Sequence, residues 1–576
     1  MNSRFILKDA FKKFTLDQDK ALDPEETVRR FRQKAKQTGI NILKHTKRID
    51  SGRLDIPVYF SVCGPDATAV TGATKQMGKG ATPEQAEASA VMELAERFSF
   101  FSFRANSENF VTATYEDVKN DAIPFSMILQ SVNDRSDDPE TSQIIFGDIP
   151  MKWARGYNLT RDREVFVPFD WFFMINEFNG PSAGNCPEEA IVQGICEIVE
   201  RHVSSIISRE KRQVPIIEQD SVTDPVVKDL LAKYRAAGIK VFISDFSLDM
   251  GIPTVGVLAY DPATFPHKSE IVWTAGTAPA PHKAMSRALT ETAQLAGDFN
   301  SGSNYVASGL PKFKTLDEAR FVMEPGHSTS IGSLPDLSDL NFRIEIERCV
   351  SALAKKGMEV LLIDTTHPDL QIPAFYTIVP GAHFRERAAE TSVAMFSAKL
   401  IAENSPPYEA LEKLEQIERV VPDRYYTAFY MGYCHLNMND PSSALECFSQ
   451  AMDRKPTREA LPTICSYMGV CLKEMEQFEK AIEVLAKGEF LDSERTDIHN
   501  MMGFCFFKLG NHERAIECFK KAININPGSA IDYANIGANY RAMGNREKAV
   551  EYYLMALEID PSIEFAREHL DAMNSE

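Results

Sequence analysis

The sequence predicts two folded parts, an α+β domain with an internally repeated design over residues 1–385 and an all-α solenoid over residues 424–576. Two observations carry this prediction. In the first part, a glycine-containing loop followed by a helix occurs three times among strand-like segments. In the second part, a two-helix unit returns at intervals of 37, 34 and 34 residues. A chain of 576 residues is too long for one hydrophobic core, so separate domains are expected.

The first part opens with a helix-start signal and continues with strand-like segments. Asp23-Pro24-Glu25-Glu26 leads into an apolar-periodic stretch, which predicts a helix. Later, an Ile-Pro pair begins a strand-like segment at Ile56, Ile252 and Ile372, where a proline without an N–H does least harm to a sheet. The last two pairs directly follow another strand-like segment, so hairpins are expected there. Strands alternating with long helices indicate the α+β class.

Two stretches are less regular. Residues 105–160 include a polar segment that is expected to be an exposed loop, and no chemistry can be assigned to them. Residues 386–423 have a helical pattern that is broken at Pro406-Pro407, so they are expected to form a linker between the two parts.

One pattern is written twice and loosely a third time. GKGATPEQAEASAVMELAER (78–97) and GNCPEEAIVQGICEIVER (184–201) share a glycine loop, a Pro-Glu helix start and a final E-x-x-E-R, and AGTAPAPHKAMSRALTETAQ (275–294) repeats part of the spacing. Carboxylates three positions apart lie on one helix face. The matching carboxylates are Glu93 and Glu96 in the first copy and Glu197 and Glu200 in the second.

The repeated pattern suits a bound nucleotide. Glycine loops and helix N-termini present backbone N–H groups that accommodate phosphate oxygens. Magnesium is usually held by protein carboxylates together with substrate phosphates. A single E-x-x-E-R is more often a solvated, salt-bridged helix face. Because the motif recurs with glycines at a fixed distance upstream, a nucleotide–magnesium site is the favoured interpretation.

Other chemistries do not fit the residues. TGATKQMGKG is no Walker A loop, because Gly80 stands where a Ser or Thr should bind magnesium. A di-iron site needs E-x-x-H, and a serine hydrolase of the nucleophile-elbow type needs G-x-S-x-G; neither motif supports those chemistries here. The ten cysteines contain no C-x-x-C pair and the eleven histidines no H-x-x-x-H pair, so neither zinc nor a disulfide framework is expected.

The C-terminal repeat resembles the tetratricopeptide (TPR) pattern. Glycines recur at 432, 469, 503 and 537, and small alanines keep the same intervals at 444, 481, 515 and 549. Prolines at 527 and 561 close the last two copies. About four units are enough to bury a continuous core. The array is expected to bind a peptide or partner protein in its groove, although a stacking module that only stabilises the chain is an open alternative.

Bulk composition excludes several classes of function. The net charge of −19 argues against a nucleic-acid partner, and the locally basic residues 31–48 favour a helix-and-strand surface over a binding patch. No apolar run reaches the roughly 18 residues of a membrane span, and no secretory signal is evident at the N-terminus. We therefore expect a cytoplasmic protein without membrane contact.

The glycine-loop and helix motifs, together with IPAFYTIVPG (372–381), resemble the YcaO family over about residues 15–385. Members of this family bind ATP without a Walker motif and phosphorylate a peptide backbone amide oxygen. The products are azoline heterocycles, thioamides or amidines, according to the nucleophile, and some members assist an enzyme that methylthiolates a ribosomal protein. The resemblance implies ATP and Mg²⁺ as cofactors and a protein or peptide as substrate.

The resemblance also assigns roles to individual residues. Alternatives stay open: Lys20 can be an ordinary solvated side chain, Ser89 a helix-packing residue, and Arg201 and Arg287 partners of nearby carboxylates. The implied magnesium ligands are Glu93, Glu96, Glu197 and Glu200; the implied nucleotide contacts are Lys20, Thr27, Ser89, Asn185, Glu189 and Arg201; the implied catalytic groups are Arg201, Arg287 and Glu291.

The chain departs from azoline-forming members in two ways. It ends in DAMNSE after the repeat array, not in a proline-rich tail, and no fused segment for leader-peptide capture is expected. These departures weaken the heterocyclase interpretation and favour thioamide formation or related chemistry. The solenoid is expected to recruit the substrate or a sulfur-delivering or methylthiolating enzyme. A non-catalytic ATP-binding accessory protein is the alternative, and a homodimer is an open possibility.

Overall fold

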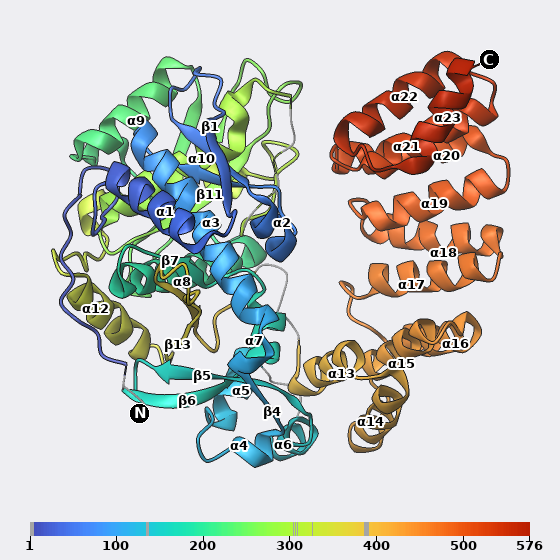
Figure 1. Ribbon diagram of the computed structural model, residues 1–576, viewed down its shortest axis with the longest axis horizontal. Helices are drawn as coiled ribbons and strands as arrows, with labels where there is room; N and C mark the ends of the chain where they lie inside the picture. The colour runs from blue at the N-terminus through green and yellow to red at the C-terminus, as the bar shows by residue number, and fades with distance from the viewer. Residues whose placement is uncertain are drawn as a thin grey trace. The chain divides into compact units, whose positions relative to one another are not determined.

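The computed structural model describes residues 5–133, 138–302, 305, 307, 309–324, 326–384 and 391–575. The chain folds into two compact units, Met1–Val393 (unit 1) and Ala394–Glu576 (unit 2) (Figure 1). Unit 1 contains helices and strands, whereas unit 2 contains helices, so the predicted fold class is confirmed. Within the described ranges, no helix combines the length and apolar character that crossing a membrane requires.

Unit 1 begins with a helix and a small antiparallel sheet. Helix α1 (Pro24–Thr38) starts where the Asp23 side chain accepts a hydrogen bond from the Glu25 N–H, as the sequence predicts. A longer helix, α3 (Pro83–Ala105), packs against α1 and the sheet. The sheet has the order β1-β2-β3, formed by β1 (Leu43–Arg48), β2 (Val58–Cys63) and β3 (Lys75–Lys79), with α2 (Pro65–Thr71) between the last two.

A six-stranded sheet forms the base of unit 1. Its order is β4-β5-β13-β14-β7, and β6 pairs antiparallel with β5 from Trp153 to Asn158. Helix α8 (Pro187–Glu210) and α3 both contact β7 and β14. The strands are β4 (Phe110–Ala113), β5 (Met151–Asn158), β6 (Arg163–Pro168), β7 (Pro181–Ala183), β13 (Leu361–Asp364) and β14 (Ala374–Ile378). The shorter helices nearby along the chain are α4 (Tyr115–Val118), α5 (Phe125–Ser131), α6 (Pro139–Gly147) and α7 (Phe169–Asn176).

A five-stranded sheet, in the order β11-β10-β9-β8-β12, completes unit 1. Helix α10 (Pro281–Ala296) packs on β10 and β11, and α8 also reaches β11. The strands are β8 (Ile216–Ile217), β9 (Lys240–Asp245), β10 (Thr254–Tyr260), β11 (Val272–Thr277) and β12 (Ser328–Thr329). The remaining α-helices of this unit are α9 (Pro225–Ala236), α11 (Arg320–Met323) and α12 (Phe342–Ala354).

The Ile-Pro pairs mark strand starts, as predicted. Strands β2, β10 and β14 begin at Val58, Thr254 and Ala374, each directly after the proline of its pair. The two expected hairpins are confirmed, because β9 pairs antiparallel with β10 and β13 pairs antiparallel with β14. The irregular stretch 105–160 supplies β4, β5 and three short helices, and part of its predicted loop, residues 134–137, lies outside the described residues.

Unit 2 consists of helices, and the expected repeat forms four helix pairs: α15 with α16, α17 with α18, α19 with α20, and α21 with α22. The four repeated alanines are fully buried, which explains why only a small residue recurs there. Within the expected linker, α13 and α14 precede the first pair. The helices are α13 (Val393–Asn404), α14 (Pro407–Val420), α15 (Tyr425–Asn437), α16 (Pro441–Asp453), α17 (Leu461–Glu474), α18 (Phe478–Leu491), α19 (Thr496–Lys508), α20 (His512–Ile525), α21 (Ala530–Ala542), α22 (Arg546–Ile559) and α23 (Glu564–Ser575).

Candidate nucleotide and magnesium site

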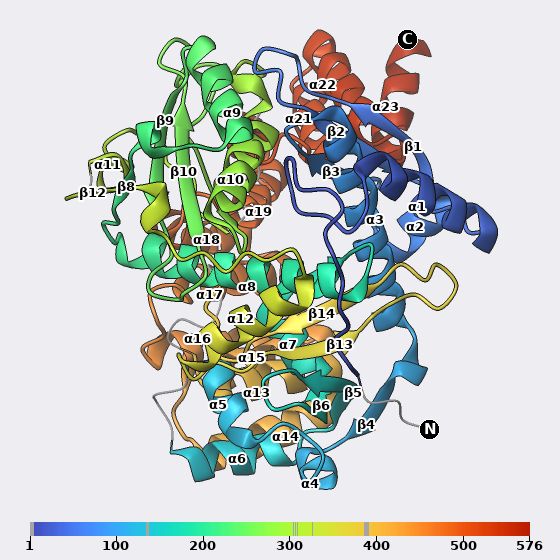
Figure 2. The same ribbon diagram turned by 90° about the vertical axis from the view of Figure 1, so that its left-hand side faces the viewer.

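Helices α3 and α8 carry the two matching E-x-x-E-R motifs and start from equivalent loops. A Cβ atom added at Gly80 would lie 2.7 Å from the backbone nitrogen of Ala86, and one at Gly184 would lie 2.5 Å from that of Ala190. Real Cβ contacts are longer, so only glycine lets each loop fold back onto the first turns of its own helix. Figure 2 shows α3, α8 and α10 around the middle of unit 1.

Each motif arginine lies against the glutamates of its own helix. Arg97 is 4.0 Å from Glu93 and 3.5 Å from Glu96, measured between nitrogen and oxygen. Arg201 is 3.9 Å from Glu197 and 3.7 Å from Glu200. The carboxylate side chains differ in exposure, from 36% for Glu93 through 17% for Glu197 and 16% for Glu96 to 5% for Glu200. The salt-bridged arrangement expected for an ordinary helix face is therefore present, but in a largely buried setting.

The two helices also act on each other electrostatically. Burial raises the pKa of Glu93, and the negative charges of Glu197 and Glu291 raise it further, although Arg97 and Lys79 oppose them. Burial and the charge of Glu197 likewise raise the pKa of Glu96 well above its usual value. Residues of separate motif copies thus lie within electrostatic range of one another. The resulting acidic cluster consists of Glu93, Glu96, Glu197, Glu200 and Glu291.

The magnesium prediction can be compared with this geometry. Among the described residues, no three acidic, histidine or cysteine side chains converge closely enough to hold a metal ion as they stand. Magnesium that bridges phosphates, however, commonly takes only one or two protein carboxylates and completes its shell with phosphate and water oxygens. The donor set fits such an ion, because a divalent cation would offset the burial and the negative charges of Glu197 and Glu291 that raise the pKa of Glu93.

Two buried arginine donors fit the phosphates. The Nε atoms of Arg201 and Arg287 are buried and have no hydrogen-bond partner in the described part of the chain. A buried donor without a partner is unfavourable, and a phosphate oxygen would satisfy it. Arg287 also donates from Nη1 to the side-chain oxygen of Gln193 over 3.0 Å. The arginines thus retain bonding capacity that their carboxylate partners do not use.

The third motif joins the cluster through a residue that the sequence does not single out. Glu291 on α10 forms an ion pair with Lys79, which lies between the two glycines of the first loop. Burial raises the pKa of Glu291, but the cations Lys79 and Arg201 outweigh it and hold this pKa below its usual value. The sequence pattern alone did not identify Lys79 or Gln193 as residues of the candidate site. The only available signal for Gln193 was its position four residues before Glu197 on the same helix face.

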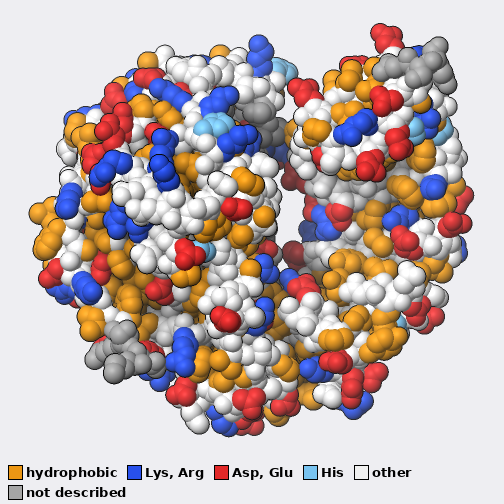
Figure 3. Space-filling model, viewed as in Figure 1, with side chains coloured by type: hydrophobic (Ala, Val, Ile, Leu, Met, Phe, Trp, Pro, Cys, Tyr) orange, Lys and Arg blue, Asp and Glu red, His pale blue; other side chains and the backbone are white. Residues whose placement is uncertain are grey.

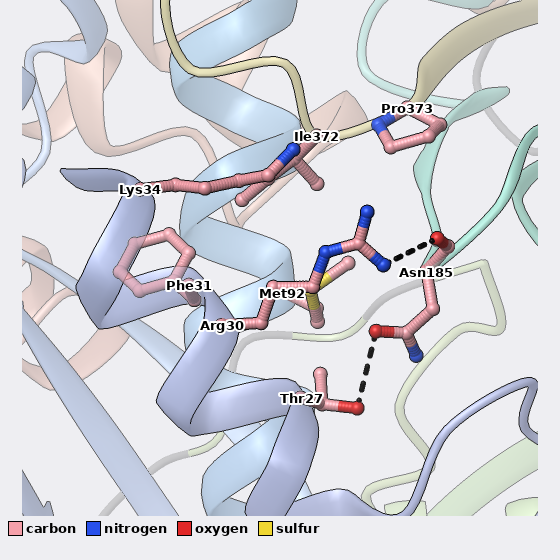
Figure 4. A pocket seen from close by; sticks show the side chains of 9 residues that line it. Thr27, Arg30, Phe31, Lys34, Met92, Asn185, Ile372 and Pro373 are labelled. Atoms are coloured by element: carbon pink, nitrogen blue, oxygen red, sulfur yellow. Dashed lines mark hydrogen bonds between the residues drawn. The ribbon is translucent and has the colours of Figure 1, made fainter. Parts of the chain in front are cut away.

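The implied nucleotide contacts form a second group beside α8. Glu189 accepts a hydrogen bond from the Ala21 N–H over 2.9 Å and lies 3.6 Å from the Lys20 ammonium. Thr27 donates to the side-chain oxygen of Asn185 over 3.2 Å, as Figure 4 shows. Lys20, Glu189 and Arg287 also line one cavity of about 40 Å³. Ser89 lies half-buried on α3, one turn before Glu93.

The N-terminal segment occupies one backbone donor of the first glycine loop, which the sequence predicted to be available for phosphate. The buried carboxylate of Asp17 accepts hydrogen bonds from the Ala81 N–H over 2.5 Å and from Ser286 over 2.8 Å. The Glu188 carboxylate accepts the Lys8 N–H over 2.8 Å. The glycine loops therefore serve close packing, and part of their N–H groups is already bonded within the chain.

A mixed fold that carries an acidic cluster and arginines with unsatisfied, buried Nε donors is compatible with the binding of a nucleotide and magnesium. The chain belongs to the YcaO family: the family model described as YcaO cyclodehydratase, ATP- and Mg²⁺-binding, matches residues 77–383. A tetratricopeptide-repeat model matches residues 494–562. Both resemblances drawn from the sequence, and the ATP and Mg²⁺ prediction at family level, are therefore confirmed.

Two curated proteins are similar to parts of this chain. The chain is 32% identical over 385 residues to an uncharacterized protein of Methanothermobacter thermautotrophicus, covering 63% of this chain and 94% of the relative. It is 29% identical over 262 residues to the ribosomal protein S12 methylthiotransferase accessory factor YcaO of Escherichia coli, covering 42% of this chain and 43% of that protein. The chain thus spans less than half of the E. coli relative.

Two structural comparisons concern the fold. YcaO from Methanopyrus kandleri bound with AMPPCP and Mg²⁺ matches with a TM-score of 0.51 and 23% identity, covering 65% of this chain and 95% of that one. A heterocyclase in complex with substrate and cofactor matches with a TM-score of 0.56 and 20% identity, covering 69% and 57% respectively. At these identities the likeness establishes the shared fold.

Proposed function

We propose that unit 1 uses ATP to phosphorylate a backbone amide oxygen of a protein or peptide substrate. One observation carries the proposal: burial and the charge of Glu197 on α8 raise the pKa of Glu93 and Glu96 on the sister helix α3, beside two arginines whose buried Nε donors are unsatisfied. Structural ion pairs normally satisfy their donors. Clustered carboxylates with raised pKa values next to unsatisfied cations are typical of a functional site.

The proposed roles follow from the charges. An amide oxygen is a poor leaving group until it is phosphorylated, and phosphoryl transfer depends mainly on positioning and charge neutralisation. Arg201 and Arg287 neutralise phosphate charge, and Lys79 holds Glu291 ionised next to Arg201. Bound magnesium would supply further neutralisation at the triphosphate. The residues proposed to hold it are Glu93, Glu96, Glu197 and Glu200, and those proposed to contact the nucleotide are Lys20, Thr27, Ser89, Asn185 and Glu189.

We propose sulfur as the incoming nucleophile, which would give a thioamide or a related product. The support is chemical: the E. coli relative is named as accessory to a methylthiotransferase, an enzyme type that handles sulfur. The TPR repeats of unit 2 would recruit the substrate or the sulfur-delivering partner. The same relative favours a second candidate function, in which the chain binds ATP but serves a partner modifying enzyme without turning over.

Phosphate release separates the two candidates. The purified chain is mixed with ATP, Mg²⁺ and peptides from a cell extract, and phosphate is measured with and without the peptides. An enzyme is expected to release phosphate faster with peptides, and Arg287→Ala is expected to slow release by about 100-fold or more. Arg320→Ala, which removes a largely exposed arginine, is the matched control and should change little. ATP binding without release in any mixture would support the accessory function.

A further inference from the structure

The basic segment near the N-terminus is not used by the proposed chemistry. In a chain with a net charge of −19, residues 27–49 contain eight lysines and arginines and no acidic residue. This segment forms most of α1 and all of β1. On the face shown in Figure 3, several Lys and Arg side chains (blue) lie over α1 and β1. The clustering is unexpected for a strongly acidic chain and calls for a physical reason.

The residues of this segment line a surface groove, which lies beside the unpaired edge of a strand. A surface groove of about 590 Å³ lies between α1 and β1, and Arg32, Lys36, Lys44 and His45 are among its lining residues. Strand β1 is the end strand of its sheet, and within the described residues it pairs only with β2. An end strand presents unpaired backbone N–H and C=O groups that can pair with another strand.

Only part of the positive charge at this edge is neutralised, since Arg48 of β1 pairs with Asp50 over 2.8 Å. Arg32 forms an ion pair with Glu87 over 2.8 Å. Lys36, Lys44 and Lys47, in contrast, form no ion pair among the described side chains, and all three are exposed or nearly so. Unpaired ammonium groups along a strand favour a partner that brings carboxylates. Backbone pairing supplies affinity in such strand additions, and side chains supply the selectivity.

We propose that β1 is a docking edge for an acidic, extended segment of the substrate protein. The segment adds as a further strand to the sheet, and its carboxylates lie against Lys36, Lys44 and Lys47. The edge is close to the proposed site: Thr46 of β1 donates to Glu87 on α3 over 2.8 Å. Glu93 follows Glu87 by six residues, about 9 Å along the helix.

Helix α1 connects the docking edge with the proposed nucleotide contacts. Arg32 and Lys36 of α1 line the groove beside β1. Thr27 and Arg30 of the same helix both hydrogen-bond Asn185, Thr27 to its side chain and Arg30 to its backbone oxygen, as Figure 4 shows. A strand seated on β1 would therefore contact a helix that also contributes to the proposed site. The docking itself needs no nucleotide. It can therefore be tested independently of the proposed reaction.

Peptide binding tests the proposal without ATP or Mg²⁺. The probe is a fluorescein-labelled peptide of about ten alternating Glu and Val residues, which places its carboxylates on one face of a strand. The wild-type chain is expected to raise the anisotropy of the probe, less so at high salt. Lys44→Glu/Lys47→Glu is expected to weaken binding by about tenfold or more. The control Lys355→Glu/Lys356→Glu changes the net charge equally at exposed positions and is expected to leave binding unchanged.

Two further probes separate strand addition from simple charge attraction. The same peptide is N-methylated on its odd or on its even residues, which removes the donors of one strand edge and keeps every charge. One of the two peptides is expected to lose binding and the other to retain it. Equal binding of both, absence of any binding to the wild type, or equal loss in test and control variants would overturn the proposal.

A second copy of the chain could cover the same edge. Sedimentation of the wild type and of Lys44→Glu/Lys47→Glu tests this. We expect the same oligomeric state for both. A wild-type dimer that the double variant converts to monomer would contradict the proposal and would make the edge a contact between copies. Circular dichroism is expected to show native folding of the variant, because both replaced side chains are exposed.

Discussion

Both units are built from repeated helices, but they repeat different residues for different reasons. In unit 2 the recurring residues include Ala444, Ala481, Ala515 and Ala549, which are completely buried where helices cross. In unit 1 the recurring residues include carboxylates whose pKa values burial raises, Glu93 and Glu96 on α3 and Glu200 on α8. Repeated alanines lower the free energy of the fold, whereas buried carboxylates cost free energy. Because the repeated carboxylates of unit 1 cost stability, their recurrence is better explained by function than by packing.

The largest change in folding stability is expected when a buried side chain of the repeats in unit 2 is truncated. Phe519 on α20 is 2% exposed and lies in the core of unit 2. Phe519→Ala should destabilise unit 2 by about 3–5 kcal/mol through lost burial and an unfilled cavity. The measurement is the urea unfolding of unit 2, followed by helical circular dichroism.

The matched control for this variant is Leu554→Ala, which truncates an apolar side chain of unit 2 that is 53% exposed. It should change stability by less than about 1 kcal/mol. Equal effects of the two variants would contradict the view that burial at helix crossings explains the repeat of unit 2.

A smaller effect on stability, and one that depends on pH, is expected from a buried carboxyl of unit 1. Burial raises the pKa of Glu345 to about 7, although Lys12 lies 2.5 Å away. Since the folded state then holds a proton that the unfolded state has lost, stability should fall as pH rises from about 4.5 to about 7. Glu345→Gln should reduce this fall, by about 3 kcal/mol across the window. Urea unfolding at several pH values measures it.

Glu347→Gln provides the comparison for this prediction, because that side chain is 53% exposed on the same helix. Its pH profile of stability should follow the wild type. If Glu345→Gln and the wild type lose stability in parallel between these pH values, the buried carboxyl is not the source of the dependence.

The local features of the fold could be predicted from the sequence. Pro24 and Pro83 mark helix starts because proline is favoured in the first turn, and Ile-Pro pairs mark strand starts. The spacing of Glu93 and Glu96 places both on one helix face whatever the tertiary fold. The tetratricopeptide repeat could be predicted because its period reflects contacts between neighbouring units.

Long-range partners could not be predicted. Lys79 meets Glu291 and Asp17 meets Ser286 across more than 200 positions of sequence, and no local periodicity records such contacts. The sequence likewise left open whether Arg201 binds carboxylates or phosphate. The structure shows that it lies beside Glu197 and Glu200 while its Nε has no partner. Arg201 therefore contacts carboxylates and still has a donor that a phosphate could accept.

The binding of ATP in the presence and absence of Mg²⁺ tests most directly whether the carboxylates of α3 and α8 share one magnesium-bound triphosphate. Calorimetry of Glu93→Gln/Glu197→Gln is compared with Glu116→Gln/Glu347→Gln, which neutralises two exposed carboxylates. The wild type and the control should bind ATP at least about tenfold more tightly with Mg²⁺ than with a chelator, and the test variant should lose this difference. An unchanged magnesium dependence in Glu93→Gln/Glu197→Gln would contradict the assignment.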